Sequence, residues 1–223
     1  MKTPHEVGST QLVKSHNLKV SSATVRNEMV KLMDLGYLDK SHVSSGRSPT
    51  DMAFRLFLNE RGNSKIDNSL ELVKIRQGIF RVRFYPDQLI KEILSQLVEN
   101  TASASFIVLD DMSRSFGVSS LMNYDELRDI KALQRILDLL EDDNLLKNVF
   151  SNYDGDEVTV LIGAELGIRD LDEFSIAFTK FDFWENRSGH MGVIGSRRMD
   201  YRKVIPVITT VRDSVHDSLK GWK

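Results

Sequence analysis

The residues of this chain with the clearest chemistry are hydrogen-bond donors gathered between positions 21 and 47. Hydroxyl, guanidinium, amide and ammonium groups donate to phosphate oxygens and to the edges of bases, which are the two kinds of contact that proteins make with duplex DNA. We therefore expect this segment to bind double-stranded DNA. The expected contact residues are Ser21, Ser22, Thr24, Arg26, Asn27, Lys31, Lys40, Ser44, Ser45 and Arg47.

An amphipathic helix that begins near Ser21 is expected to position most of these groups. Ser21 and Ser22 are both suitable N-cap residues, because a serine hydroxyl can accept from the free N–H groups of the first turn. Gly36 suits the left-handed position that ends a helix. The apolar residues recur at spacings of three and four, at Val25, Met29 and either Leu32 or Met33.

A second, shorter helix is predicted just before this one, from an N-cap at Ser9 to His16. Asn17 is suited to the left-handed residue of a tight turn. A short helix, a turn of three to four residues and a longer helix form a helix-turn-helix, whose second helix enters the major groove of DNA.

Two short strands are predicted after the longer helix. They lie near Leu38 and near Ser45 to Arg47, around a turn at Gly46 with Arg47 at its tip. A groove-binding helix followed by such a hairpin is a winged helix. An ordinary surface helix followed by a plain turn has the same pattern, so the preceding short helix is what favours DNA binding.

The composition is that of an ordinary globular protein. The chain has 223 residues, of which 41% are hydrophobic and 28% charged, enough for one or two domains. It has no cysteine, which excludes disulfides and thiolate metal sites and fits a reducing, cytoplasmic location. No apolar run approaches the ~18 residues that cross a bilayer, so we expect no membrane segment.

The charges are distributed unevenly along the chain. Residues 1–62 contain nine Lys/Arg and six Asp/Glu, whereas the remaining residues contain 21 and 26. A basic amino-terminal region on an acidic body would be drawn towards phosphates. The excess is small, so it supports DNA binding without establishing it.

Enzymatic activity is not expected, and neither is a metal or other cofactor. The histidines are scattered without metal-ligand spacing, and the sequence contains neither a nucleophile elbow nor a phosphate-binding loop. His42, on the predicted hairpin, is more simply explained as an exposed residue near phosphate than as a pH sensor. The five histidines are His5, His16, His42, His190 and His216.

The fold class predicted from periodicity is α+β. We expect a DNA-binding domain over residues 1–62, a linker with helices over 63–100 and a sheet-and-helix domain over 101–223. A helix is predicted near 51–60, with Thr50 as its cap, and further helices near 69–80, 89–97, 124–140 and 200–219, with a second short helix that follows 124–140 and ends near 150. Strands are predicted near 105–109, 157–163, 174–179 and 190–194. Alternation over 174–179 predicts a half-buried strand.

Two separated motifs resemble one known family. The segment VSSATVRNEMVKLMDLGYLDKSHVSSGRSPT, from Val20 to Thr50, and the segment GVIGSRRMDY, from Gly192 to Tyr201, are similar to the two signatures of HrcA, the bacterial heat-inducible transcription repressors. Glu6 to Ser9, Gly117 to Leu121 and Ile162 to Glu165 also fit. The resemblance implies a winged helix-turn-helix followed by a GAF-like domain, here an antiparallel sheet with helices on one side.

The resemblance also implies function and partners. The protein would repress heat-shock (chaperone) operons by binding an inverted-repeat CIRCE-type operator, would lose activity on heating and would regain it with chaperonin help. An inverted repeat requires a homodimer, and we expect the contact to use the helix at 124–140 or the last helix. For the apolar stripe on 124–140, however, a place in the domain core is the more ordinary explanation.

This sequence departs from the family pattern in several places. The family has a helix before the helix-turn-helix, and its absence here should expose Leu12, Val13 and Val25. The family also has an inserted dimerisation domain between the positions of Asp110 and Gly117. We therefore expect a reduced GAF-like domain that lacks the family's main subunit contact.

A ligand-sensing regulator is the alternative function. GAF-like sheets often hold small molecules, and the segment from Gly189 to Tyr201 is predicted to form a strand, a glycine turn and a helix. Arg197 and Arg198 at the start of that helix could hold an anion. A tight strand-to-helix turn, without any ligand, is the more ordinary explanation of the glycines.

Overall fold

The computed structural model describes residues 6–40, 46–61, 70–109, 112–123, 130–153, 155–184 and 187–220. The chain is a mixed α and β protein that divides into two compact units, Met1–Asn63 and Ser64–Lys223. In the described part of the chain, no helix is long and apolar enough to cross a membrane. Residues 62–69, which include the start of the predicted linker region, lie outside the described residues.

The described residues of the first unit form three helices and a small hairpin. Its elements are α1 (Ser9–His16), α2 (Ser22–Asp34), β1 (Leu38–Asp39), β2 (Ser48–Pro49) and α3 (Asp51–Arg61). The turn between α1 and α2 is confirmed: Asn17 has φ 48° and its N–H bonds the Val13 carbonyl. The N-cap of α1 is Gly8, with no side-chain capping bond, and Ser9 is the first helical residue, so the predicted Ser9 cap is wrong.

Gly36 ends α2 as predicted, in a Schellman motif. Its φ is +78°, its N–H donates to the Met33 carbonyl, and the next N–H, of Tyr37, donates to Leu32 at 2.8 Å. Thr50 then joins the start of α3 to this point. Its hydroxyl donates to the Gly36 carbonyl at 2.7 Å and accepts from the Ala53 N–H, which confirms Thr50 as a capping residue.

The second unit is a five-stranded antiparallel sheet with helices. Its strand order is β4-β3-β7-β6-β5, and every neighbouring pair is antiparallel. The strand β4 was not predicted from the sequence. The elements are α4 (Leu70–Val82), α5 (Pro86–Thr101), β3 (Ala104–Leu109), β4 (Ser113–Phe116), η1 (Val118–Asn123), α6 (Ile130–Glu141), α7 (Asp143–Phe150), β5 (Thr159–Ile162), η3 (Gly163–Leu166), β6 (Phe174–Asp182), β7 (Ser188–Ser196) and α8 (Tyr201–Leu219).

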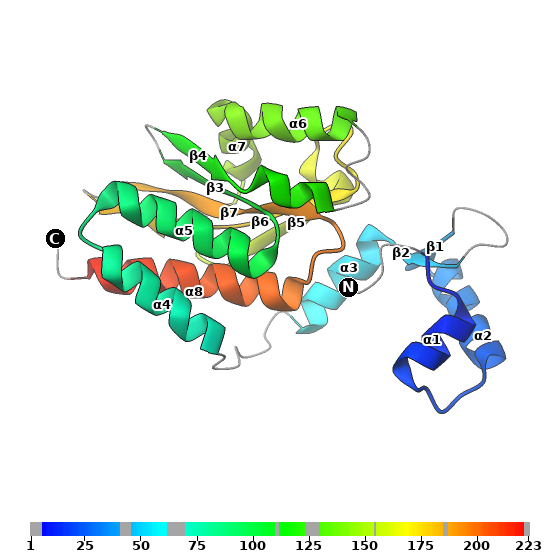
Figure 1. Ribbon diagram of the computed structural model, residues 1–223. Coiled ribbons are helices and arrows are strands. Elements are labelled where there is room, and N and C mark those ends of the chain that lie inside the picture. Colours follow the sequence, from blue (N-terminus) through cyan, green and yellow to red (C-terminus); the bar gives the residue numbers. More distant parts are fainter. Residues whose placement is uncertain are drawn as a thin grey trace. The chain divides into compact units, whose positions relative to one another are not determined.

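Helices cover both faces of this sheet, contrary to the prediction of one. Helices α5 and α8 lie on one face, with α4 outside them, and α6 and α7 lie on the other (Figure 1). Strand β6 is accordingly buried on both faces rather than half-buried. Its alternating Ser175, Ala177 and Thr179 are small because α8 packs against them, and the Tyr201 hydroxyl of α8 bonds the Ser175 hydroxyl at 3.0 Å.

Helices α4 and α5 belong to this second unit and are not part of a separate linker region. Both pack against α8, and their apolar residues Ile75, Ile79, Leu89 and Ile93 are completely buried. Burial of that kind is typical of a domain core. The helical segment predicted over 63–100 therefore extends the carboxy-terminal domain.

The apolar stripes of α6 and α8 are used inside the unit. Ala132, Ile136, Leu139 and Leu140 of α6 belong to the core cluster over the sheet, and the inward residues of α8, from Val204 to Val215, are buried. Part of the predicted helix, residues 124–129, lies outside the described residues. The buried residues support the core explanation for the α6 stripe, whereas Ile130 and Leu137 on the same helix are exposed.

Candidate nucleic-acid interface

Ser21 determines where α2 begins. Its backbone is extended, with φ −71° and ψ 153°, and its hydroxyl accepts from the Thr24 N–H at 3.0 Å. The Ser21 and Thr24 hydroxyls are also hydrogen-bonded to each other at 2.8 Å. Ser22 is the first helical residue rather than a cap. These bonds fix the first turn of α2, whose remaining N–H groups and hydroxyls are suited to a phosphate.

The polar side of α2 is exposed and its apolar side is turned inward. Arg26 and Asn27 are exposed, whereas Val25 is only 9% exposed, so the predicted exposure of Val25 is wrong. Met29 and Met33 are half-buried. Leu32 is 40% exposed, which makes Met33 the inward residue of the two alternatives.

Lys31 continues the exposed side one turn further along but is already paired. Its ammonium group lies 2.8 Å from a Glu28 carboxylate oxygen, three residues earlier on the same exposed surface. An exposed pair of this kind contributes little to stability, so a phosphate can take the place of the carboxylate. Lys31 is thus a weaker candidate contact than Arg26 or Asn27.

The hairpin after α2 differs from the prediction at its second strand. Leu38 pairs with Pro49 and Asp39 with Ser48, and Lys40 is exposed beyond the first strand. Ser44 and Ser45 lie outside the described residues, as does His42. Lys40 therefore directly follows β1, and the hairpin is the next element after α2 in the chain.

Arg47 does not lie at a tip. It forms a β-bridge with Val7, whose N–H bonds the Arg47 carbonyl at 2.9 Å while the Arg47 N–H bonds the Val7 carbonyl at 3.0 Å. Its half-buried side chain donates to the Gly46 carbonyl. Gly46 is needed for close approach and not for a turn, because a Cβ there would overlap the backbone of Glu6 and Val7.

Further exposed basic residues of the first unit were not predicted as DNA contacts. Lys14 and His16 lie in the last turn of α1, and Lys19 lies in the turn before α2. In a helix-turn-helix the first helix crosses the DNA backbone, so basic residues at these places are candidates for phosphate contacts. Their position in or next to the predicted turn between the two helices was the sequence feature that could have identified them.

The second candidate site, at Arg197 and Arg198, is not an open anion site. Arg197 is 18% exposed, its guanidinium lies 2.9 Å from the Glu173 carboxylate, and its carbonyl accepts from the Tyr201 hydroxyl. Asp200 caps α8 and so places a carboxylate at the helix N-terminus. The predicted glycine turn is also wrong, because Gly192 and Gly195 lie within β7.

Among the described residues there is no group of three or more His, Asp or Glu side chains placed to hold a metal ion. The features that remain are an exposed, donor-rich helix side and a hairpin next to it.

Comparison with known proteins identifies the family. The family model described as "HrcA protein C terminal domain" matches residues 18–205. This chain belongs to the HrcA family. Curated proteins of this family are named heat-inducible transcription repressors, so the chain is a heat-shock transcription repressor and not an enzyme.

Curated relatives in the family match almost the whole chain at low identity. A "Heat-inducible transcription repressor HrcA" of Clostridium perfringens (strain SM101 / Type A) is 27% identical over 321 residues, covering 98% of this chain and 94% of the relative. The protein of that name in Clostridium acetobutylicum is 24% identical over 315 residues, covering 96% and 91%. Because these alignments are longer than the 223 residues of this chain, the relatives contain segments without a counterpart here.

A solved structure supports the fold alone. "Crystal structure of a hypothetical protein at 2.2 A resolution" superposes with a TM-score of 0.77 at 16% identity and covers 98% of this chain and 93% of that one. The arrangement of helices and sheet is therefore found in a known structure. The likeness carries no information on function.

Proposed function

We propose that this protein represses heat-shock (chaperone) operons by placing α2 in the major groove of an inverted-repeat CIRCE-type operator. The observation that carries the proposal is the exposed pair Arg26 and Asn27 on a helix whose opposite side is turned into the unit. The hairpin β1–β2 directly after that helix supports a winged helix.

Base recognition is assigned to Arg26 and Asn27. An arginine can bond guanine, and an asparagine can bond adenine, through two hydrogen bonds each, and one such contact is worth about 1–3 kcal/mol of discrimination. Ser21, Ser22 and Thr24 at the helix start bind phosphate and orient the helix. Lys31, Lys40, Ser44 and Ser45 contribute further backbone contacts.

Arg47 acts by holding the hairpin in place. Its main-chain bridge to Val7 ties the residue just before the second strand to the segment before α1. Arg47→Ala keeps that main-chain bridge but removes the half-buried side chain beside the hairpin, and it is expected to weaken binding to all duplexes alike. That pattern would be the same for a direct phosphate contact, so the melting temperature must be measured together with affinity.

A homodimer is part of the proposal because an inverted repeat presents two equivalent half-sites. The GAF-like domain would carry the subunit contact, through residues other than the inward stripes of α6 and α8. Repression in the cytoplasm, loss of binding on heating and recovery with a chaperonin belong to the same proposal. Sedimentation with and without operator DNA tests the dimer, and a strict monomer in both would contradict it.

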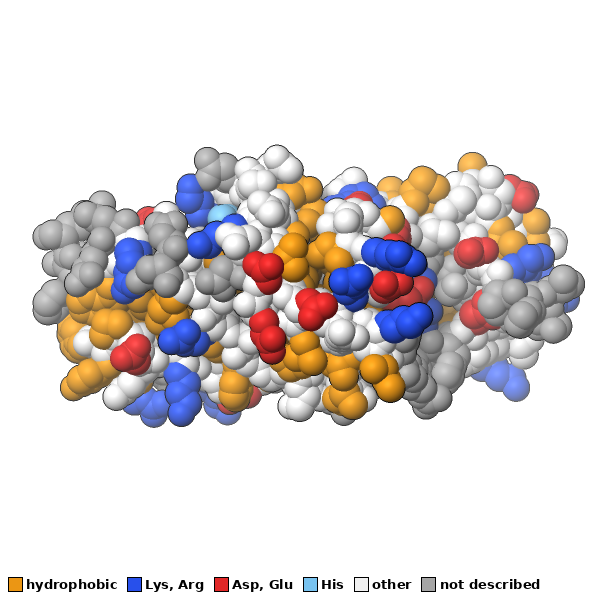
Figure 2. All heavy atoms as spheres, turned by 90° about the horizontal axis from the view of Figure 1, so that it is seen from above, with side chains coloured by type: hydrophobic (Ala, Val, Ile, Leu, Met, Phe, Trp, Pro, Cys, Tyr) orange, Lys and Arg blue, Asp and Glu red, His pale blue; other side chains and the backbone are white. Residues whose placement is uncertain are grey.

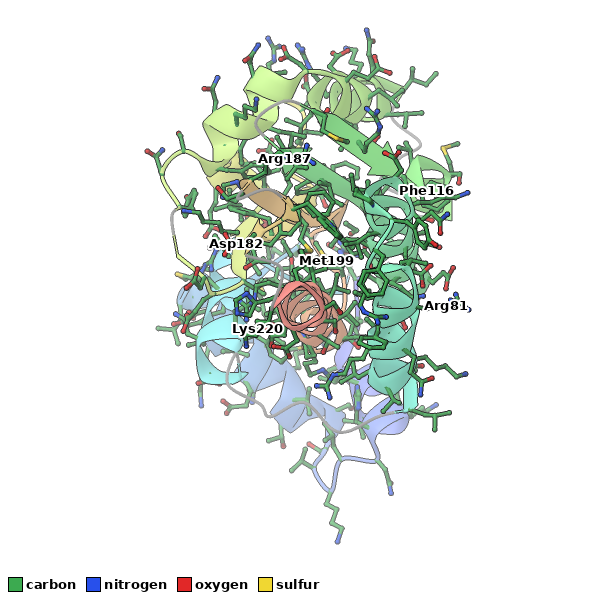
Figure 3. The ribbon with its side chains drawn as sticks, turned by 90° about the vertical axis from the view of Figure 1, so that its left-hand side faces the viewer. Arg81, Phe116, Asp182, Arg187, Met199 and Lys220 are labelled. Atoms are coloured by element: carbon green, nitrogen blue, oxygen red, sulfur yellow. The ribbon has the colours of Figure 1, made fainter. Side chains whose placement is uncertain are left out.

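A gel-shift series with matched arginine variants tests DNA recognition. Arg26→Ala is expected to lose preference for the inverted repeat over a scrambled duplex, by about 5- to 150-fold. Arg81→Ala is the control, because Arg81 is also exposed but lies on α4 of the second unit, where it is labelled in Figure 3. Equal preference in all three proteins would exclude Arg26 from base recognition.

A further inference from the structure

We propose that the second unit binds a small oxyanion, with a phosphate or phosphoryl group as the best match, in a cavity at one end of its sheet. The cavity has a volume of about 260 Å³ and lies between α7 and the ends of β3, β6 and β7. Its polar lining consists of Lys147, Ser151, Lys180, Ser188 and His190. Figure 3 views the protein from this end, with Asp182 of β6 and Arg187 just before β7 labelled.

The strand register brings two of the polar groups into one row. His190 of β7 is the partner of Val108 in β3 and of Lys180 in β6. Directly opposed residues in neighbouring strands extend from the same face of a sheet. Val108 belongs to the core cluster shared with α6 and α7, so the His190 and Lys180 side chains extend towards α7, which supplies Lys147.

An aromatic floor separates the cavity from the core. Phe150, the last residue of α7, has its ring centroid 4.8 Å from that of His190 and 4.5 Å from that of Phe178. Two residues further along β7, Gly192 pairs with Phe106 on one side and Phe178 on the other, and it has no side chain to fill the space between their rings. The ring of Phe150 packs in this region, so the cavity stops at His190 and stays small.

The chemistry of the lining favours an anion. The two lysines supply ammonium donors and the two serines supply hydroxyls, and no Asp or Glu is among the described lining residues. Figure 2 shows Lys and Arg side chains gathered around a histidine near the left-hand end of the α6–α7 face. The volume is below the roughly 300–1,000 Å³ of pockets for drug-sized ligands, which fits a compact oxyanion.

Lys147 and Lys180 are not equally suitable positions for a substitution that tests this cavity. Lys180 also lines a neighbouring cavity with Asp156 and Asp182, so its replacement changes two places. Lys147 and Lys180 both make contacts within the unliganded protein, and an anion is expected to exchange with some of them. Lys147 is half-buried on α7 and lines only the first of these two cavities, which makes it the better position to test.

Calorimetric titration of the full chain with inorganic phosphate at constant ionic strength is the test. We expect saturable binding to the wild type and at least about tenfold weaker binding to Lys147→Gln and Lys180→Gln, with Lys147→Arg close to wild type. Lys91→Gln is the control, because it removes the same charge from an exposed site on α5, on the other face of the sheet. DNA is left out, so the result does not depend on repressor activity.

Parallel titration with acetate distinguishes a phosphoryl group from a carboxylate, since both are oxyanions. Absence of saturable binding, or an equal loss in Lys91→Gln and Lys147→Gln, would overturn the proposal. If a glutamine variant does not fold, phosphate-induced shifts of wild-type amide signals decide. Shifts confined to Ser151, Ser188 and His190 support the site, and shifts only elsewhere contradict it.

Discussion

The two units of this protein differ in the interactions that stabilise each of them internally. In the second unit one apolar cluster joins the sheet to α6 and α7, and the inward residues of α4, α5 and α8 are buried on the other face. In the first unit the described buried apolar residues are only Val25, Phe54 and Leu58. Hydrogen bonds at helix caps and turns, between residues close in sequence, also stabilise the first unit. We therefore expect core substitutions to act mainly on the second unit, and substitutions at caps and exposed donors to act mainly on the first.

The largest effect is expected for Phe178→Ala. Phe178 is 1% exposed and contacts the ring of Phe150, and removal of a buried phenyl ring costs about 3–5 kcal/mol. Phe116→Ala is the control, because Phe116 on β4 is half exposed (Figure 3). Denaturant unfolding measures both changes, and a similar small loss in the two variants would contradict the stabilising role of the buried cluster in the second unit.

The next effect, on recognition, is expected for Asn27→Ala. Loss of a two-bond contact to a base should cost about 1–3 kcal/mol of discrimination at one operator position. Affinities for a set of operators, each changed at one base pair, locate that position. The unfolding free energy should stay within about 0.5 kcal/mol of wild type because Asn27 is exposed. Loss of affinity at every position equally would assign Asn27 to the DNA backbone.

Gly36→Ala is expected to destabilise the first unit by about 1–2 kcal/mol, since residues with a Cβ are strained at the left-handed φ of Gly36. The added Cβ would also lie 2.9 Å from the Met52 methyl group. Gly155→Ala is the control, because a Cβ there has no neighbour closer than 4.0 Å. Equal melting temperatures for the two variants would show that this motif does not fix the end of α2.

The smallest effect is expected for Ser21→Ala, which removes the hydroxyl that caps α2 and costs about 1 kcal/mol. Ser22→Ala should change the melting temperature much less, because Ser22 is the first helical residue and not the cap. The pair separates the two serines that the sequence alone left equivalent. The reverse order would place the cap at Ser22.

Local features of the first unit were predictable from sequence. The turn at Asn17, the end of α2 at Gly36 and the cap at Thr50 depend on neighbours within a few residues, and all three are confirmed. The bridge between Val7 and Arg47 was not predictable, because it joins residues 40 positions apart. Without that bridge, Gly46 resembles a turn residue and Arg47 resembles a tip residue.

Long-range packing also explains what was missed in the second unit. The alternation of Phe174 to Thr179 predicts one exposed face, but the small residues of that face accommodate α8 instead. The cavity proposed to bind an anion depends on the strand register between β3, β6 and β7, which cannot be predicted from a local sequence pattern. In the candidate DNA interface, exposure of Arg26 and Asn27 followed from helix periodicity alone.

The most direct test of DNA recognition by the first unit is a salt titration of binding to a labelled inverted-repeat duplex, measured by fluorescence anisotropy. We predict binding at low ionic strength that weakens steeply as salt increases, with a slope of about −0.9 per phosphate contacted. Lys31→Ala should reduce that slope by about one. Failure to bind the inverted repeat or any other duplex at low ionic strength would contradict the proposed function.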